Sequence, residues 1–105
     1  IAGPSFESFI IENILTCIPT EVRPYFYRTA TGTELDLILD WGGKKGLWAV
    51  EIKKGLDPKP SKGFFNAIED LKPQRAFIVY AGHERYPYKK GIDVISLRDF
   101  INLAN

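Results

Sequence analysis

The sequence predicts an α/β domain in which a central mixed sheet is flanked by helices. Helical stretches and β-prone runs follow one another in the order α-β-β-β-α-β-β-α. A helix joins the third and fourth strands, so we expect those two strands to run parallel through a right-handed crossover. The chain has 105 residues, of which 45% are hydrophobic and 26% charged, and we expect residues 1–105 to form a single domain with one core.

The first two elements are a helix and an aromatic strand. Residues 5–18 are predicted to be helical, because Gly3 and Pro4 provide a start signal and apolar residues recur on one helical face. Residues 25–29 are rich in tyrosine and phenylalanine, which favours a strand, and the turn at residues 31–33 ends it.

The later elements follow similar signals. Glycine and proline mark loops, a serine can cap a helix, and a continuous apolar run is typical of a strand buried on both faces. The expected elements are strands at 34–41 and 47–53, a helix that Ser61 caps and Pro73 stops, a buried strand at 76–81, a loop at 83–91, a short strand at 93–96 and a closing helix at 97–104.

Composition restricts the classes of function. The net charge is +1, so the chain lacks the basic field typical of nucleic-acid binding, and any such contact must come from local patches. No apolar run approaches the roughly 20 residues that span a bilayer, and no signal peptide is visible, so we expect no membrane partner. Cys17 is the only cysteine and cannot form an internal disulfide, which fits a reducing cytoplasm. We expect it to be a small apolar core residue.

Two carboxylates on neighbouring strands are the most specific feature. Opposed residues of an antiparallel hairpin have position numbers with a constant sum, and a turn centred near Gly43 or Lys44 makes that sum 87 or 88. Asp36 and Glu51 add to 87, so we expect their Cβ atoms to face each other at about 5 Å. Such a pair is destabilising unless a cation lies between the carboxylates, and their oxygens suit Mg²⁺ or Mn²⁺. Lys53 projects from the same face as Glu51.

Glu7 lies within the apolar stripe of the first helix. If the stripe is buried, the carboxylate needs a partner, because burying an isolated charge is costly. If the first turn is frayed, Glu7 stays hydrated and complements the helix dipole. The sequence leaves both interpretations open. The apolar members of the stripe are Phe6, Ile10, Ile11, Ile14, Cys17 and Ile18.

The acidic residues and the Glu51-Ile52-Lys53 triplet resemble the PD-(D/E)XK nuclease superfamily, whose restriction-endonuclease-like core has the order α-β-β-β-α-β. A closer resemblance is to a bacterial and archaeal domain of unknown function that lies C-terminal to an AAA+ ATPase core. Methionine is absent even at position 1, which agrees with a C-terminal fragment of a longer ATPase protein. The resemblance spans Gly3 to about Ile101 and rests on residues 3–10, Tyr27-Arg28-Thr29, Gly32, Glu34-Leu35-Asp36 and Val50-Glu51-Ile52-Lys53.

This resemblance implies metal-dependent hydrolysis of nucleic acid, with DNA as the expected substrate and the upstream ATPase as the expected partner. Asp36, Glu51 and the backbone carbonyl of Ile52 would hold Mg²⁺ or Mn²⁺. Lys53 would orient or help deprotonate the attacking water and stabilise the developing negative charge. Glu7 would hold a water or a second ion.

Other side chains carry weaker predictions. Arg28 could contact a phosphate, but an ion pair with Glu34 across the hairpin is the favoured interpretation. His83 is expected to be a loop residue without a catalytic role. Trp41 and Trp48 are expected to be packing anchors, although an exposed Trp41 could stack on a base. A phosphate-binding rim could be formed by Lys44, Lys45, Lys53, Lys54, Lys59, Lys62, Lys89 and Lys90, with scattered hydrated lysines as the alternative.

Two alternatives to the nuclease remain. The first is a nuclease-derived module that binds DNA or protein, or assembles the ATPase, without turnover. The second is a structural charge network of Asp36, Glu51 and Lys53 that binds no metal. The intact acidic set favours the enzyme, whereas the small net charge favours the module.

Overall fold

The computed structural model describes residues 5–30 and 34–105, with the backbone alone at residues 34 and 90. The predicted start signal at Gly3 and Pro4 and the turn at 31–33 lie outside this range. The elements are α1 (Phe6–Cys17), β1 (Arg23–Arg28), β2 (Glu34–Asp40), η1 (Gly43–Lys45), β3 (Leu47–Lys53), α2 (Lys62–Leu71), β4 (Arg75–Tyr80), β5 (Tyr86–Pro87), η2 (Lys89–Gly91), β6 (Ile92–Ser96) and α3 (Leu97–Ala104). The predicted order is confirmed, except that the expected loop at 83–91 contains the short strand β5 and the 3₁₀ turn η2.

The strands form one mixed sheet in the order β1-β2-β3-β4-β6-β5. The β1–β2, β2–β3 and β5–β6 pairs are antiparallel, and the β3–β4 and β4–β6 pairs are parallel. The predicted parallel crossover through α2 is therefore confirmed. β1 and β5 are the two edge strands.

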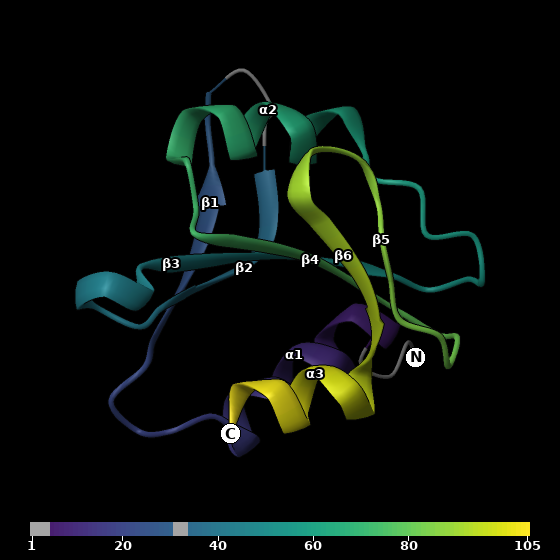
Figure 1. Ribbon diagram of the computed structural model, residues 1–105, viewed down its shortest axis with the longest axis horizontal. Helices are drawn as coiled ribbons and strands as arrows, with labels where there is room; N and C mark the ends of the chain where they lie inside the picture. Colours follow the sequence, from purple (N-terminus) through teal and green to yellow (C-terminus); the bar gives the residue numbers. More distant parts are fainter. Residues whose placement is uncertain (1–4, 31–33) are drawn as a thin grey trace.

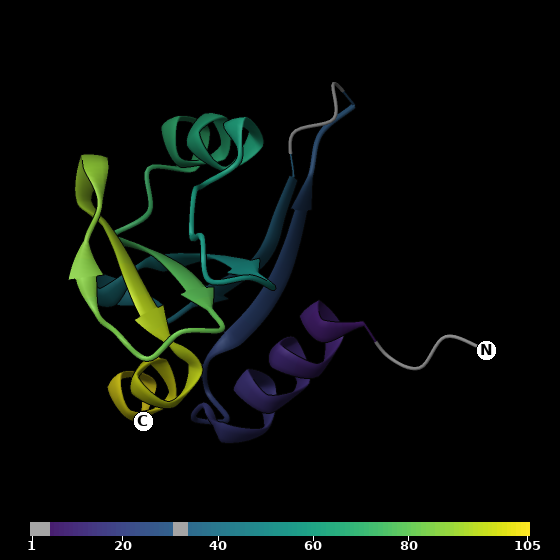
Figure 2. The same cartoon turned by 90° about the vertical axis from the view of Figure 1, so that its right-hand side faces the viewer.

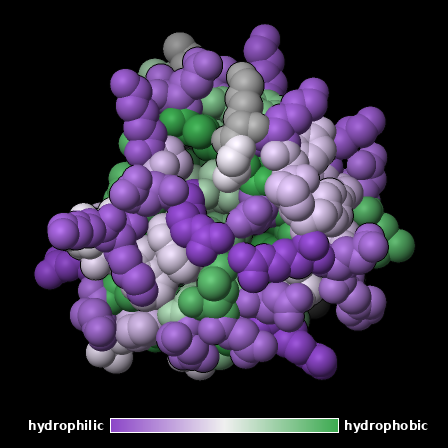
Figure 3. All heavy atoms as spheres, in the orientation of Figure 1, coloured by the Kyte–Doolittle hydropathy of each residue, from purple (hydrophilic) through white to green (hydrophobic). Residues whose placement is uncertain are grey.

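Helices cover both faces of the sheet. Figures 1 and 2 show α2 on one face and α1 and α3 together on the other. On the α1/α3 side the rings of Trp48, Phe77 and Phe100 pack with centroids 5.1–6.2 Å apart. On the α2 side Phe64 is fully buried. The outer surface seen in Figure 3 is largely hydrophilic, with small apolar areas between the charged side chains.

A β-bulge interrupts the pairing of β1 and β2. Between the Tyr25–Ile38 pair and the Tyr27–Leu35 pair, β2 contains one residue more than β1. A bulge re-aims the side chains around it. Leu35 and Ile38 therefore both belong to the α2-side core, although Leu37 belongs to the α1-side core. The bulge includes position 36, so it bears directly on the candidate site.

The tryptophans at the β2–β3 turn are packing residues, as predicted. Trp48 is buried, and the half-buried Trp41 packs against it with ring centroids 4.6 Å apart. Lys45 places its Nζ 4.2 Å from the centroid of the Trp41 ring. Cys17 is half-buried on α1 and free.

Candidate functional site

The candidate site lies at the carboxyl ends of the parallel strands. The pairing register places Lys53 of β3, Tyr80 of β4 and Ser96 of β6 side by side. Two helices also begin at this edge. Ser61 caps α2 and Ser96 caps α3, and each hydroxyl accepts a backbone N–H of its own helix. The Ser61 cap was predicted from the sequence and is confirmed.

Asp36 is held against β3 by a hydrogen bond. Its Oδ2 accepts the backbone N–H of Ile52 at 2.7 Å. The β2–β3 ladder has the predicted constant sum, from the Leu37–Val50 pair to the Asp40–Leu47 pair, and these pairs do not extend to Asp36. The Asp36 side chain therefore bonds a β3 amide where the backbone ladder has ended.

Glu51 is buried on the α2 side of the sheet. Only 8% of the residue is exposed, and its two carboxylate oxygens accept the backbone N–H of Ser61 at 3.0 Å and the Ser61 hydroxyl at 2.7 Å. The same hydroxyl accepts the N–H of Phe64 at 3.0 Å. The N-terminal end of a helix favours negative charge, so this environment stabilises the carboxylate.

The predicted Asp36–Glu51 pair is therefore not part of the β2–β3 ladder, and the two carboxylates bond different partners, the Ile52 amide and Ser61. Asp36 lies within the β-bulge and lines a hollow of about 480 Å³ with Glu7, Ile11 and Arg28. We call this the Asp36 hollow. Asp36 and Glu51 nevertheless meet at the same short segment of β3. Asp36 bonds the Ile52 amide, and Ile52 directly follows Glu51 in the strand.

Glu7 is exposed in the first turn of α1, so a buried Glu7 is ruled out and the hydrated interpretation is the correct one. Ile10 and Ile14 form the buried part of the helix face instead. Glu7 still lies beside the site. It lines the Asp36 hollow and also a second hollow of about 300 Å³ with Ile52 and Lys54, which we call the Lys54 hollow.

The basic residues of the site are divided between two ends of the sheet. Arg28 lines the Asp36 hollow and pairs in register with Glu34. Their predicted ion pair depends on the side chain at 34, which lies outside the described part. Lys44 and Lys45 are in η1, at the opposite end of β3 from Lys53. A seven-residue strand is about 20 Å long, so these two lysines cannot join Lys53 around one phosphate.

The oxygen donors at this edge are of the kind that bind a divalent cation which takes only a few of its ligands from the protein. Within the described residues no group of three or more His, Cys, Asp or Glu side chains is placed to hold a metal. Mg²⁺ commonly binds through one or two carboxylates and completes its shell with water and substrate oxygens. Asp36 and Glu51, with the Ile52 carbonyl, supply hard donors of that kind.

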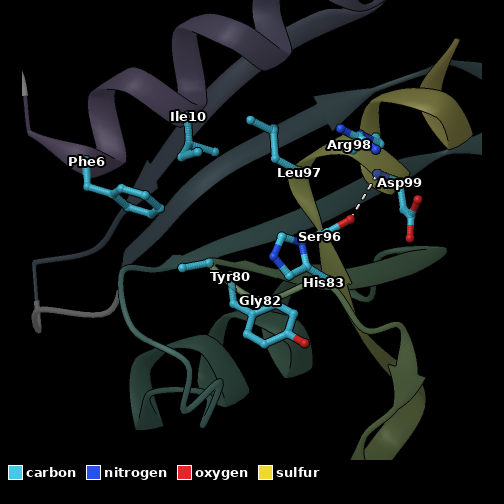
Figure 4. A pocket seen from close by; sticks show the side chains of 10 residues that line it. Phe6, Ile10, Tyr80, Gly82, His83, Ser96, Leu97, Arg98 and Asp99 are labelled. Atoms are coloured by element: carbon cyan, nitrogen blue, oxygen red, sulfur yellow. Dashed lines mark hydrogen bonds between the residues drawn. The ribbon is translucent and has the colours of Figure 1, made fainter.

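Sequence reasoning missed a third hollow, which adjoins the same edge. It measures about 450 Å³ and lies between α1, the end of β4 and the start of α3 (Figure 4). We call it the His83 hollow. The carboxyl ends of parallel strands are the usual ligand position in open α/β sheets, and that rule could have directed attention to residues after 80 and 96. Its side chains include Phe6, Ile10, Tyr80, His83, Ser96 and Arg98.

Together these features define a helix-covered mixed-sheet domain with acidic and basic side chains at the carboxyl ends of its parallel strands. The chain belongs to the family described as Domain of unknown function (DUF4143), whose profile matches residues 2–100. Two relatives, an uncharacterized protein of Mycobacterium bovis and one of Mycobacterium tuberculosis, are each 33% identical over 85 residues, which is 81% of this chain. The chain spans 19% of the length of these relatives. No solved structure matched it. Across residues 5–30 and 34–105, no helix has the length and apolar character needed to cross a membrane.

Proposed function

We propose that this domain is a divalent-metal-dependent nuclease with a restriction-endonuclease-like core of the PD-(D/E)XK type. The observation that carries the proposal is the 2.7 Å hydrogen bond from the Ile52 amide to Asp36. It holds one carboxylate against the strand segment that also contains Glu51 and Lys53. The element order from α1 to β4 is compatible with such a core.

Each side chain has a distinct role in this proposal. Asp36, Glu51 and the Ile52 carbonyl would hold the cation. A carboxylate has about four lone-pair positions, so Glu51 can keep both Ser61 hydrogen bonds and still offer oxygen electrons. A bound Mg²⁺ or Mn²⁺ would neutralise phosphate charge and promote ionisation of a water. Lys53 stabilises negative charge on the phosphate in the transition state, and the exposed Glu7 accepts a hydrogen bond from water.

The proposed setting is the C-terminal part of an AAA+ ATPase protein that acts on DNA. Local basic side chains, rather than the net charge of +1, would contact the phosphates. Arg28 and Lys54 are the exposed basic residues that line the hollows beside Asp36 and Ile52.

The experiment combines metal binding with cleavage in the full-length protein. Wild type should bind Mn²⁺ in calorimetry and cleave at least one of single-stranded, duplex and branched DNA. Lys53→Ala should retain Mn²⁺ binding and lose cleavage, whereas Glu51→Gln should weaken both. Lys44→Ala, at the far end of β3, is the charge-matched control and should behave as wild type. Absence of Mn²⁺ binding at millimolar concentration in wild type would refute the nuclease.

A second candidate is a nuclease-like module that binds nucleic acid or protein without turnover. One observation favours it specifically, namely that both oxygens of Glu51 are already hydrogen-bonded to Ser61 in a residue that is only 8% exposed. These hydrogen bonds join β3 to the start of α2, so Glu51 can have a purely structural role. The module predicts DNA or partner binding that weakens with salt, no cleavage of any substrate, and unchanged binding in Glu51→Gln.

A further inference from the structure

The three hollows at the carboxyl edge join through shared residues. Glu7 lines both the Asp36 hollow and the Lys54 hollow. Phe6 lines both the Lys54 hollow and the His83 hollow. The three hollows therefore follow one another around the N-terminal turn of α1, from Arg28 at one end to Arg98 at the other, and we call this row of hollows the groove.

The far end of this groove carries basic side chains from two separate elements. His83 follows β4, Arg98 lies in the first turn of α3, and both are exposed. In the described part of the chain neither side chain has a hydrogen-bond or ion-pair partner. Figure 4 shows the His83 ring beside Ser96, whose hydroxyl accepts the Asp99 N–H at 3.1 Å. Donors for an anion are thus available from two elements, the segment after β4 and the start of α3.

The opposite wall of the His83 hollow is apolar. Phe6 and Ile10 project into it from α1 (Figure 4). An aromatic ring beside basic side chains is the combination that binds single-stranded nucleic acid, because bases stack on the ring while cations contact the backbone. An isolated inorganic anion would make no use of this apolar wall.

We propose that the groove seats one strand of the nucleic acid, and that Arg98 and His83 bind a backbone phosphate distant from the reacting one. The inference rests on the proposed function, because it takes the candidate site as the place of reaction. Lys53 and Ser96 are two strand spacings apart, about 10 Å. A stacked strand advances about 3.4 Å per nucleotide, so this second phosphate lies at least about three nucleotides away.

Asp99 and Arg98 carry opposite charges, so substitutions at the two positions test whether the His83 hollow binds an anion. Asp99 also lines the His83 hollow, and its negative charge would oppose phosphate binding there. Asp99→Asn removes that charge and keeps the backbone N–H that Ser96 accepts. If the hollow binds phosphate, Arg98→Gln and Asp99→Asn must change affinity in opposite directions. A merely structural role for both residues would not produce opposite effects.

The test measures fluorescence anisotropy of a labelled single-stranded oligonucleotide with the full-length protein, without divalent metal so that cleavage is suppressed. Arg98→Gln should weaken binding about threefold to tenfold and lower the slope of log K against log salt by about 0.7. His83→Gln should weaken binding less, and Asp99→Asn should strengthen it. Lys44→Gln is the control, because Lys44 is an exposed cation at the far end of β3. Circular dichroism verifies that each variant is folded.

The outcomes separate this inference from the nuclease proposal. If Arg98→Gln and Lys44→Gln change the affinity for the oligonucleotide equally, the strand-binding inference is wrong, even if the wild type cleaves DNA in Mn²⁺. If the oligonucleotide binds in an Arg98-dependent manner and the full-length protein cleaves no DNA when Mn²⁺ is added, the groove is upheld and the nuclease proposal is wrong. If inorganic phosphate binds in an Arg98-dependent manner and the oligonucleotide does not, the hollow is a small-anion site and the strand-binding inference is wrong.

Discussion

Ser61→Ala tests whether the buried Glu51 is tied to the start of α2. The substitution removes a hydroxyl that accepts the Phe64 N–H at 3.0 Å and donates to Glu51 at 2.7 Å, while the Ser61 backbone N–H still reaches Glu51. Loss of a serine N-cap costs about 1 kcal/mol. Loss of a hydrogen bond to a charged group costs about 1.5–3 kcal/mol. We therefore expect the free energy of unfolding to fall by about 2.5–4 kcal/mol.

The assay is urea unfolding followed by tryptophan fluorescence, with Ser5→Ala as the matched control. Ser5 caps α1 in the same way, accepting the Ser8 N–H at 3.1 Å, but it is exposed and bonds no carboxylate. Its loss should cost about 0.5–1 kcal/mol. In a thermal scan the Ser61 variant should melt roughly 10–25 °C below wild type. If the two substitutions lowered the free energy of unfolding equally, the hydrogen-bonded contact between Glu51 and the start of α2 would be refuted. The observation that favours the module would then be lost as well.

Three further predictions concern other contacts. Asp36→Asn keeps an oxygen that can accept the Ile52 N–H, so the free energy of unfolding should change by less than about 1 kcal/mol, while Mn²⁺ affinity falls in calorimetry. A variant that no longer folds would mean that the charge of Asp36 is itself structural. Burial, and then the Asp70 carboxylate 3.4 Å away, raise the pKa of Tyr27, so its contribution to stability is present below the ordinary tyrosine pKa of about 10 and is lost as pH rises above it. Asp70→Asn should lower the pKa of Tyr27 in a tyrosinate absorbance titration, and an unchanged titration would contradict the contact. Phe77→Ala should cost about 3–5 kcal/mol in urea unfolding, because the ring is fully buried between Trp48 and Phe100; a cost below that of Ser5→Ala would contradict the core assignment.

Much of the fold follows from local signals in the sequence. The apolar run before residue 81, the serine at 61 and the helix between two strands each act over a few residues, so the buried strand, the capped helix and the parallel crossover were predictable. β5 was not, because a strand of two residues that contains Pro87 has no detectable alternation.

The candidate site was less predictable, because its geometry depends on long-range pairing. The constant-sum rule held along the ladder from Leu37 to Asp40, but a bulge lies beside it, and Asp36 bonds the Ile52 amide instead of pairing with Glu51. No glycine at positions 36 or 37 marks that bulge. The apolar stripe of the first helix likewise did not show whether Glu7 is buried. The position of the helix on the sheet decides which helical residues the sheet covers, and the sequence does not give that position.

The two edge strands limit how this domain can meet other chains. β5 is only two residues long, and β1 contains Pro24, which has no N–H to donate. If two copies paired antiparallel through β1 in full register, Arg23 of each would stand opposite Arg28 of the other, and like charges so placed repel. Both features oppose the pairing of two copies through their sheet edges. A neighbouring protein must recognise side chains here, because the backbone at either edge is a poor template for another strand.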